Sequence, residues 1–184
     1  MTLPSGFDSI YNAKERYQGH YTKCSYLRIY KKVAEYIKPT DYVLELGCGT
    51  GQMMELLLDN KIKKYTGYDF SPVGIQMTQN RIKDYDATAI CQDLYEIEKF
   101  PDADIYISIE VMEHLKDELS VLKSIPKGKK VIITVPNYLG SGHVRKFDKP
   151  IEVLARYSNI IDCIDIITVP YGSGKIFLLY GVIY

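Results

Sequence analysis

Residues 43–51 read Val-Leu-Glu-Leu-Gly-Cys-Gly-Thr-Gly, a mainly apolar run that passes directly into a glycine-rich turn. The run predicts a buried strand, and the residues from 52 onward predict a helix that begins at the turn. Gly47, Gly49 and Gly51 allow positive φ angles and the close approach of a ligand, while the first turn of the helix presents free N–H groups. This junction is therefore a candidate site for a nucleotide-like cofactor.

The spacing of the glycines separates this turn from the dinucleotide-binding fingerprint. That fingerprint needs a third glycine where this chain has Gln52. Glu45, two residues before the first glycine, would repel a pyrophosphate and suits a cationic ligand. The stretch resembles motif I of the class I S-adenosylmethionine (AdoMet) methyltransferases, whose cofactor carries a sulfonium and an α-ammonium. The alternative is a nicotinamide oxidoreductase, which a titration would reveal by binding of NAD without affinity for AdoMet.

Length and composition indicate one domain over residues 1–184, since 46% of the 184 residues are hydrophobic and 25% are charged. Lys and Arg together number 23, as do Asp and Glu, so the overall charge gives no sign of a nucleic-acid partner. The four cysteines form no Cys-x-x-Cys pair, and no apolar segment has membrane length. We expect a cytoplasmic protein without a membrane partner and leave its oligomeric state open.

Predicted strands alternate with predicted helices along the chain, which is typical of a mostly parallel sheet covered on both faces. Strands are expected at 42–46, 64–69, 87–92, 104–109, 129–135, 161–169 and 175–184. Helices are expected at 27–37, 52–60, 72–84, 111–124 and 151–157. The expected fold is α/β, a Rossmann-like seven-stranded methyltransferase fold whose last strand is antiparallel. Residues 1–40 lie outside the common sheet as an N-terminal helical cover or lid.

Residues at the ends of the second and third strands are candidates for holding adenosine. Asp69 ends the second strand, at the sheet edge where open α/β folds bind ligands, and can accept from both ribose hydroxyls. The resemblance implies that Asp93 accepts from the adenine amino group, that Gln92 or Leu94 presents backbone to the ring, and that Phe70 packs against it. The alternatives are that Asp69 merely assists the helix N-cap, that Asp93 is a turn residue and that Phe70 is an ordinary core aromatic.

The first thirty residues are rich in tyrosine, and Tyr21 is our expected cofactor contact among them. The alternative is that these tyrosine rings only pack over the hydrophobic core. The full expected cofactor-binding set is Tyr21, Glu45, Gly47, Cys48, Gly49, Gly51, Asp69, Phe70, Gln92, Asp93, Leu94 and Glu110.

Residues 109–115 read Ile-Glu-Val-Met-Glu-His-Leu, similar to the segment found in ubiquinone-pathway O-methyltransferases and small-molecule relatives. If residues 111–124 are helical, Glu110 and His114 stand four residues apart on one face. His114 is then a candidate general base with Glu110 orienting it. A surface histidine paired with Glu110 or Asp117 is the alternative.

The expected loop over residues 136–150 carries two further candidates. Gly140 and Gly142 allow it to move, so His143 and Arg145 could form a lid that excludes water and holds an acidic substrate group. A plain surface loop is the alternative. The expected catalytic residues are His114, His143 and Glu110.

Glu110, Glu113, His114 and His143 also resemble the metal-binding set of small-RNA 3′-end ribose 2′-O-methyltransferases, which use a Glu-x-x-Glu-His segment and a later histidine. Two carboxylates and two imidazoles would suit a divalent cation. That family has His-x-His-x-Phe where this chain has His-Val-Arg-Lys-Phe from His143 onward. We therefore expect no metal ligands and regard a nucleic-acid substrate as the less favoured alternative.

Together these patterns predict an AdoMet-dependent methyltransferase that moves a methyl group to oxygen or nitrogen of a small-molecule acceptor by direct in-line transfer. A noncatalytic AdoMet-binding module is a further alternative. Such a module would keep the residues from Glu45 to Asp93 but lack an accessible channel to the sulfonium.

Overall fold

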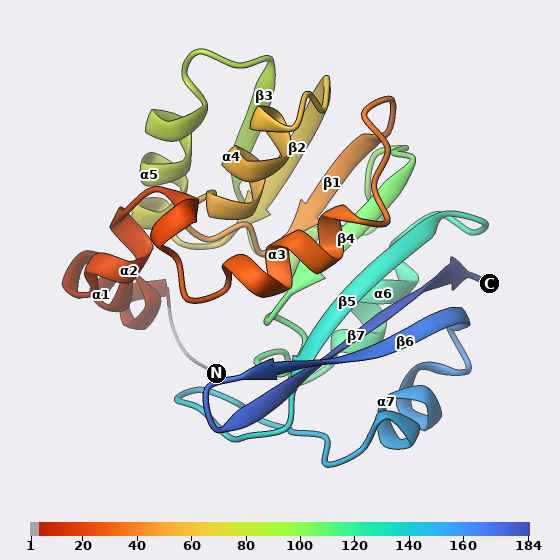
Figure 1. The fold of residues 1–184 in the computed structure, drawn as a ribbon. Coiled ribbons are helices and arrows are strands. Elements are labelled where there is room, and N and C mark those ends of the chain that lie inside the picture. The colour runs from red at the N-terminus through yellow and green to blue at the C-terminus, as the bar shows by residue number, and fades with distance from the viewer. Residues whose placement is uncertain (1–3) are drawn as a thin grey trace.

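A single seven-stranded sheet organises the computed structural model, which describes residues 4–184 (Figure 1). Its strands are β1 (Tyr42–Leu46), β2 (Lys64–Asp69), β3 (Ala87–Cys91), β4 (Ile105–Ile109), β5 (Lys130–Pro136), β6 (Ile161–Tyr171) and β7 (Gly174–Ile183). They lie in the order β3-β2-β1-β4-β5-β7-β6. The pairs within β1–β5 are parallel, and β7 runs antiparallel to both neighbours. The expected mostly parallel sheet with a reversed last strand is confirmed.

Helices cover both faces of the sheet (Figure 1). They are α1 (Pro4–Ala13), α2 (Glu15–Gln18), α3 (Leu27–Ala34), α4 (Gln52–Asp59), α5 (Pro72–Ile82), α6 (Glu118–Lys123) and α7 (Pro150–Tyr157), with 3₁₀ turns η1 (Tyr21–Lys23) and η2 (Leu94–Glu96). Of the expected N-terminal cover over 1–40, residues 1–3 lie outside the described residues. Within residues 4–184, no helix is both long and apolar enough to cross a membrane.

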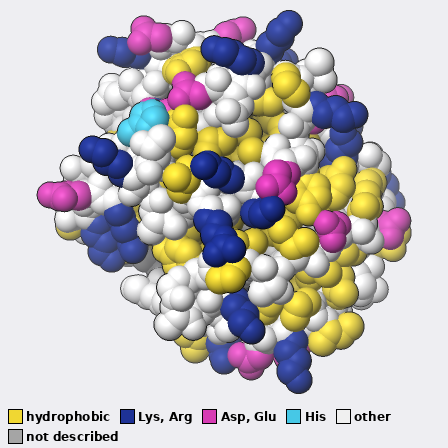
Figure 2. Space-filling model, in the orientation of Figure 1, with side chains coloured by type: hydrophobic (Ala, Val, Ile, Leu, Met, Phe, Trp, Pro, Cys, Tyr) yellow, Lys and Arg dark blue, Asp and Glu magenta, His cyan; other side chains and the backbone are white. Residues whose placement is uncertain are grey.

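The two faces of the sheet carry separate hydrophobic cores, as alternation along a strand requires. Val43 of β1 packs with Ile29 of α3 on one face, whereas its neighbour Leu44 packs with Val121 of α6 and Tyr157 of α7 on the other. The face turned toward the viewer in Figures 1 and 2 is the one that α3, α4 and α5 cover. Over β5–β7 on this face, hydrophobic side chains gather at the surface (Figure 2). The parallel strands thus present their carboxyl ends on one edge of a firmly packed sheet.

The helix expected over residues 111–124 is wrong in its first half, because α6 begins only at Glu118. Residues 111–117 form turns, and the Asp117 side chain caps α6 by accepting from the Ser120 N–H. The cause is distant in sequence: the Arg145 guanidinium donates to the carbonyls of Met112, Leu115 and Lys116, which a continuous helix would use for its own ladder.

Candidate active site

The turn after β1 has the backbone that its glycines predict. Gly47, Gly49 and Gly51 take φ angles of 78°, 54° and 77°. The N–H groups of Gly47 and Cys48 both donate to the Tyr68 carbonyl at 2.8 and 2.9 Å. A Cβ added to Gly51 would lie 2.6 Å from Cγ2 of Thr78, which α5 presses against the turn. The glycines therefore serve close packing of the turn as well as approach of a ligand.

A cavity of about 490 Å³ opens above this turn and extends past the carboxyl ends of β2 and β4 to the loop after β5. Nine expected cofactor-site residues line it: Glu45, Gly47, Cys48, Gly49, Asp69, Phe70, Asp93, Leu94 and Glu110. The expected catalytic residues His114 and His143 line it too. The structure therefore joins the glycine turn to the acid and imidazole groups in one continuous space.

Tyr21, Gly51 and Gln92 do not line the cavity. Tyr21 packs beside α4, and its hydroxyl donates to Asp59 at 2.9 Å. The expectation that Tyr21 contacts the cofactor is therefore wrong. Gly51 acts as the N-cap of α4. The Gln92 N–H donates to the Asp69 carbonyl, which continues the pairing of β2 and β3 by one residue.

Asp69 fixes the glycine turn from the end of β2. One of its carboxylate oxygens accepts from the Gly49 N–H at 2.8 Å and the other from the Ser71 N–H at 2.9 Å. Burial raises the pKa of Asp69 to about 6, although these two bonds act against the rise. Ser71 is the N-cap of α5, so the bond from its N–H shows Asp69 assisting the helix N-cap, as the alternative expected. The ribose role stays a prediction. Each carboxylate oxygen keeps a lone pair for a further donor such as a ribose hydroxyl.

Glu45 is buried beneath the turn, with 2% of its surface exposed. The Tyr65 hydroxyl donates to its carboxylate at 2.8 Å, and burial raises its pKa to about 8. Within the described residues no lysine or arginine forms an ion pair with it. A buried acid without a cation of its own is a site that a cationic ligand would stabilise.

The N-terminal segment supplies cavity residues that the sequence did not single out. Phe7 of α1 lies edge-on to Phe70 and to His114, with ring centroids 5.4 and 5.3 Å apart. Tyr11, 8% exposed, lies so close to the turn that a Cβ on Gly49 would be 3.1 Å from its hydroxyl. Tyrosine enrichment pointed to this segment, but only tertiary packing decides which rings face inward.

Arg81 of α5 anchors the same segment. Its guanidinium donates to the carbonyls of Tyr17, Gln18 and Gly19 at 2.9 to 3.1 Å, and its Nε donates to the Thr50 carbonyl. Residues 17–19 are thereby tied to the glycine turn itself.

Glu110 occupies a strained position at the end of β4. Its φ of 56° is rare for a residue with a Cβ, and such strain gathers at functional sites. The backbone N–H donates to Thr134 Oγ1 at 3.0 Å, while the carboxylate accepts from that hydroxyl at 3.0 Å and from the Tyr138 hydroxyl at 3.4 Å. Burial raises the pKa of Glu110 to about 8. Thr134 thus holds the backbone and the side chain in one orientation.

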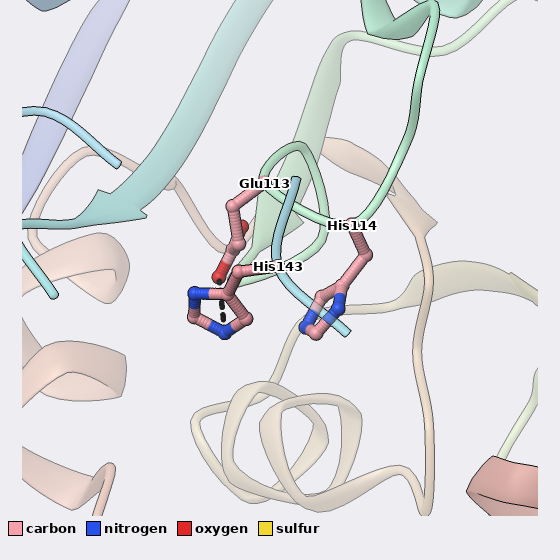
Figure 3. A group of neighbouring side chains, drawn as sticks. All are labelled: Glu113, His114 and His143. Atoms are coloured by element: carbon pink, nitrogen blue, oxygen red, sulfur yellow. Dashed lines mark ion pairs between the residues drawn. The ribbon is translucent and has the colours of Figure 1, made fainter. Parts of the chain in front are cut away.

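Glu113, His114 and His143 meet in one group (Figure 3). All three line the cavity that Glu110 also lines. Glu113 has no exposed surface, and neither of its carboxylate oxygens has a hydrogen-bond partner among residues 4–184. The ring nitrogen Nε2 of His143 lies 4.0 Å from its Oε1. Burial, together with Glu110, raises the pKa of Glu113 well above its ordinary value.

Both imidazoles in this group are held in the neutral form. Burial and the neighbouring His143 lower the pKa of His114 to about 4, and burial also lowers the pKa of His143. The two rings stand edge to face with centroids 4.6 Å apart. Glu110 does not orient His114, because its carboxylate is bonded to Thr134 and Tyr138, so that expectation is wrong. The surface pairing with Asp117 is wrong as well, since His114 lines the cavity.

Arg145 is not the free lid residue that the sequence suggested. Besides its three bonds to backbone carbonyls, it forms an ion pair with the fully buried Glu118 at 2.7 Å. Arg156 of α7 pairs with the other oxygen of Glu118 at 2.8 Å. The loop is further joined to the turn by the Val144 N–H, which donates to the Glu113 carbonyl at 2.8 Å. Arg145 therefore fixes His143 opposite Glu113 instead of facing a substrate.

Comparison with known proteins agrees with this arrangement. The profile of the family described as Methyltransferase domain matches residues 17–158. Malonyl-[acyl-carrier protein] O-methyltransferase of Anoxybacillus flavithermus (strain DSM 21510 / WK1) is 30% identical over 92 residues, which are 50% of this chain. That match spans 36% of the relative's own length.

Solved structures share the fold at low identity. Magnesium protoporphyrin IX methyltransferase (ChlM) from Synechocystis PCC 6803, with bound S-adenosylhomocysteine (SAH), superposes with a TM-score of 0.72 at 16% identity, covering 98% of this chain and 94% of that one. N-methyltransferase NodS from Bradyrhizobium japonicum WM9, also bound to SAH, gives 0.70 at 16% identity, covering 86% and 87%.

The fold and the cavity define a class I methyltransferase architecture. The chain belongs to the family of methyltransferase domains, because the family profile spans most of its length. The expected membership of the methyltransferases is thereby confirmed.

Proposed function

We propose that the chain transfers a methyl group from AdoMet to oxygen or nitrogen of a small-molecule acceptor. The observation that carries this proposal is the single cavity, which begins at the glycine turn and ends among Glu110, Glu113, His114 and His143. A noncatalytic binding module would have no need of the second end. The continuous cavity therefore favours an enzyme over that alternative.

The residues at the first end fit AdoMet and not a diphosphate. Glu45 and Asp69 are buried acids, and the glycine turn leaves room that side chains would fill. Glu45 suits the α-ammonium and Asp69 the ribose hydroxyls. Lys14 and Arg16 line the cavity from the N-terminal segment and are cations available to the carboxylate of the amino-acid tail. Phe70 and Phe7 offer apolar surface to the adenine ring.

The work left to the protein is alignment, exclusion of water and removal of a proton. When bound, AdoMet supplies an already activated methyl donor. The neutral imidazoles of His114 and His143 can each take a proton from an acceptor. Glu113 would stabilise His143 once that ring is charged, because the two side chains already face one another at 4.0 Å.

SAH binding tests the proposal directly. Calorimetry on the purified chain should give a micromolar or tighter complex with SAH and no measurable complex with NAD. A methylated product, detected by mass spectrometry in a panel of small hydroxyl and amine compounds, would then define the acceptor. Binding of NAD without binding of SAH would overturn the proposal.

A second candidate, metal-assisted methylation of an RNA 3′-end ribose, is favoured by one observation. Glu113, His114 and His143 offer ligand atoms that all lie within 4.8 Å of one another, and Glu113 has no partner for either oxygen. A carboxylate and two imidazoles suit a divalent transition metal. Titration with Mn²⁺ followed by a chelator tests it: methylation that is unaffected by chelation and by His143→Ala would exclude this candidate.

A further inference from the structure

The acceptor end of the cavity contains more buried acid than the cofactor can neutralise. Glu45 and Asp69 lie at the cofactor end, so Glu110 and Glu113 remain for the acceptor. Across residues 4–184, no lysine or arginine forms an ion pair with either. Arg145, which approaches this region, already pairs with Glu118 and three carbonyls. A cation bound here would therefore meet two carboxyl groups that are not paired with a lysine or an arginine.

Three tyrosine rings line the same end of the cavity and lie nearly parallel. Tyr26 precedes α3, Tyr138 lies in the loop after β5, and Tyr171 ends β6. The rings of Tyr26 and Tyr171 have centroids 4.8 Å apart and planes 13° apart, and those of Tyr138 and Tyr171 are 6.1 Å and 16° apart. Aromatic faces attract organic cations and stack with planar rings. Segments far apart in the chain thus build one aromatic wall beside two acids.

Glu110 links the aromatic wall to the acids. Its carboxylate accepts from the Tyr138 hydroxyl, and its strained φ of 56° is kept by two bonds to Thr134. The strained backbone and these bonds hold the carboxyl group in one orientation, so it can receive a ligand without reorganising.

We infer that the acceptor is an organic amine, bound as its cation between the carboxyl groups of Glu110 and Glu113 and the faces of Tyr26, Tyr138 and Tyr171. The inference rests on the proposed function and narrows it from oxygen or nitrogen to nitrogen. A bound cation would favour the ionised form of both carboxyl groups, whereas an acceptor carrying a carboxylate would find no cationic partner at this position. Before its nitrogen can take a methyl group, the ammonium must lose one proton, which the neutral imidazole of His143 can accept.

Three probes that differ only in the terminal group test this inference: phenethylamine, 2-phenylethanol and phenylacetate. Each is titrated by calorimetry into the chain saturated with SAH. Phenethylamine should bind at least about tenfold more tightly than phenylacetate, with the neutral alcohol between them. SAH affinity, measured first, reports on the proposed function independently.

Matched variants test which residues cause the preference for phenethylamine over phenylacetate. Glu110→Gln and Glu113→Gln should each reduce the preference for phenethylamine about tenfold, whereas Glu98→Gln, the same change at an exposed position, should leave it unaltered. Tyr171→Phe keeps the aromatic face and should retain amine binding, while Tyr171→Leu should weaken it. Near-ultraviolet circular dichroism checks that each variant is folded, and either acid variant suffices if the other fails to fold.

The outcomes are distinguishable. Absence of SAH binding would overturn the proposed function and the amine site with it. SAH binding together with equal or tighter binding of phenylacetate would overturn the amine site alone. So would tight phenylacetate binding that appears only with Mn²⁺, because a metal at Glu113 would then be the cation that the carboxylates hold.

Discussion

The two ends of the cavity are built in different ways. At the cofactor end, the contacts join neighbouring strands and their turns: the turn after β1 is held by Asp69 and by the Tyr68 carbonyl at the end of β2. At the acceptor end, Glu110, Tyr138 and Tyr171 come from segments that lie far apart in the chain. Backbone geometry builds the first end, and long-range side-chain contacts build the second. Substitutions should therefore affect the two ends separately.

The largest expected effect is on the cofactor end. Asp69→Ala removes the proposed ribose acceptor and the anchor of the Gly49 N–H, so SAH affinity should fall at least about a hundredfold while the fold persists. Calorimetry measures this. Asp86→Ala, which truncates an exposed aspartate before β3, is the control and should bind SAH normally. Undiminished affinity in Asp69→Ala would refute the ribose assignment.

Arg145→Ala tests the acceptor end alone. The change frees three carbonyls and removes one of two cations from buried Glu118, which should lower the free energy of unfolding by about 3 kcal/mol. Methyl transfer should fall with it, whereas SAH affinity should stay within about threefold of the unmodified chain. Arg156→Ala removes the other cation of Glu118 but touches none of these carbonyls. If both variants lose transfer equally, Arg145 does not position His143.

Buried acids at both ends should make the ligand-free protein less stable in mild alkali. The folded pKa values of Glu45 and Glu110, about 8, lie above the unfolded value of 4.5, so the folded state holds their protons more tightly. This stabilisation is complete below pH 4.5 and is lost as the pH rises through 8. Histidines oppose the trend only below pH 6.5, because the folded pKa of His114 is lowered.

Between pH 6.5 and 8.5, the free energy of unfolding should therefore fall by about 2 kcal/mol for each of these two groups. Urea denaturation at several pH values measures the slope. Glu45→Gln should remove the share that comes from Glu45, about 2 kcal/mol over this range. In the unmodified chain, added SAH should reduce the slope if a ligand cation pairs with Glu45. A flat profile would show that neither acid is held in its protonated form.

The smallest expected effect is on stability, and it measures how much the close packing of the glycine turn contributes. Gly51→Ala and Gly128→Ala both place a Cβ on a residue with φ of 77°. At Gly128 the added atom meets nothing within 4 Å, whereas at Gly51 it meets Thr78 at 2.6 Å. Gly128→Ala should cost about 1 kcal/mol and Gly51→Ala about 2 kcal/mol, measured by thermal unfolding. Equal costs would mean that α5 shifts away freely.

The sequence predicts correctly those elements whose deciding interactions are local. The observed strand ends lie within two residues of the predicted ones, because hydrophobic runs and turn residues decide them. Except for Gly51, the expected cofactor residues of the glycine turn line one cavity with Asp69 for the same reason, while their contacts with a cofactor stay a prediction. The helix predicted over residues 111–117 is absent because the guanidinium of Arg145, some thirty residues away, donates hydrogen bonds to the carbonyls of this segment. The predicted cofactor contact of Tyr21 is wrong because a sequence rich in tyrosine does not show which ring faces a cavity that later strands form.

One helix lies over both ends of the cavity. Through Phe7, α1 touches Phe70 at one end and His114 at the other, and through Tyr11 it reaches the glycine turn. Arg81 holds residues 17–19, and the Ser71 hydroxyl donates to Asp8 of α1. Because the same helix covers both ends, a substitution that loosens α1, such as Asp8→Ala, should expose the cofactor pocket and the acceptor pocket together.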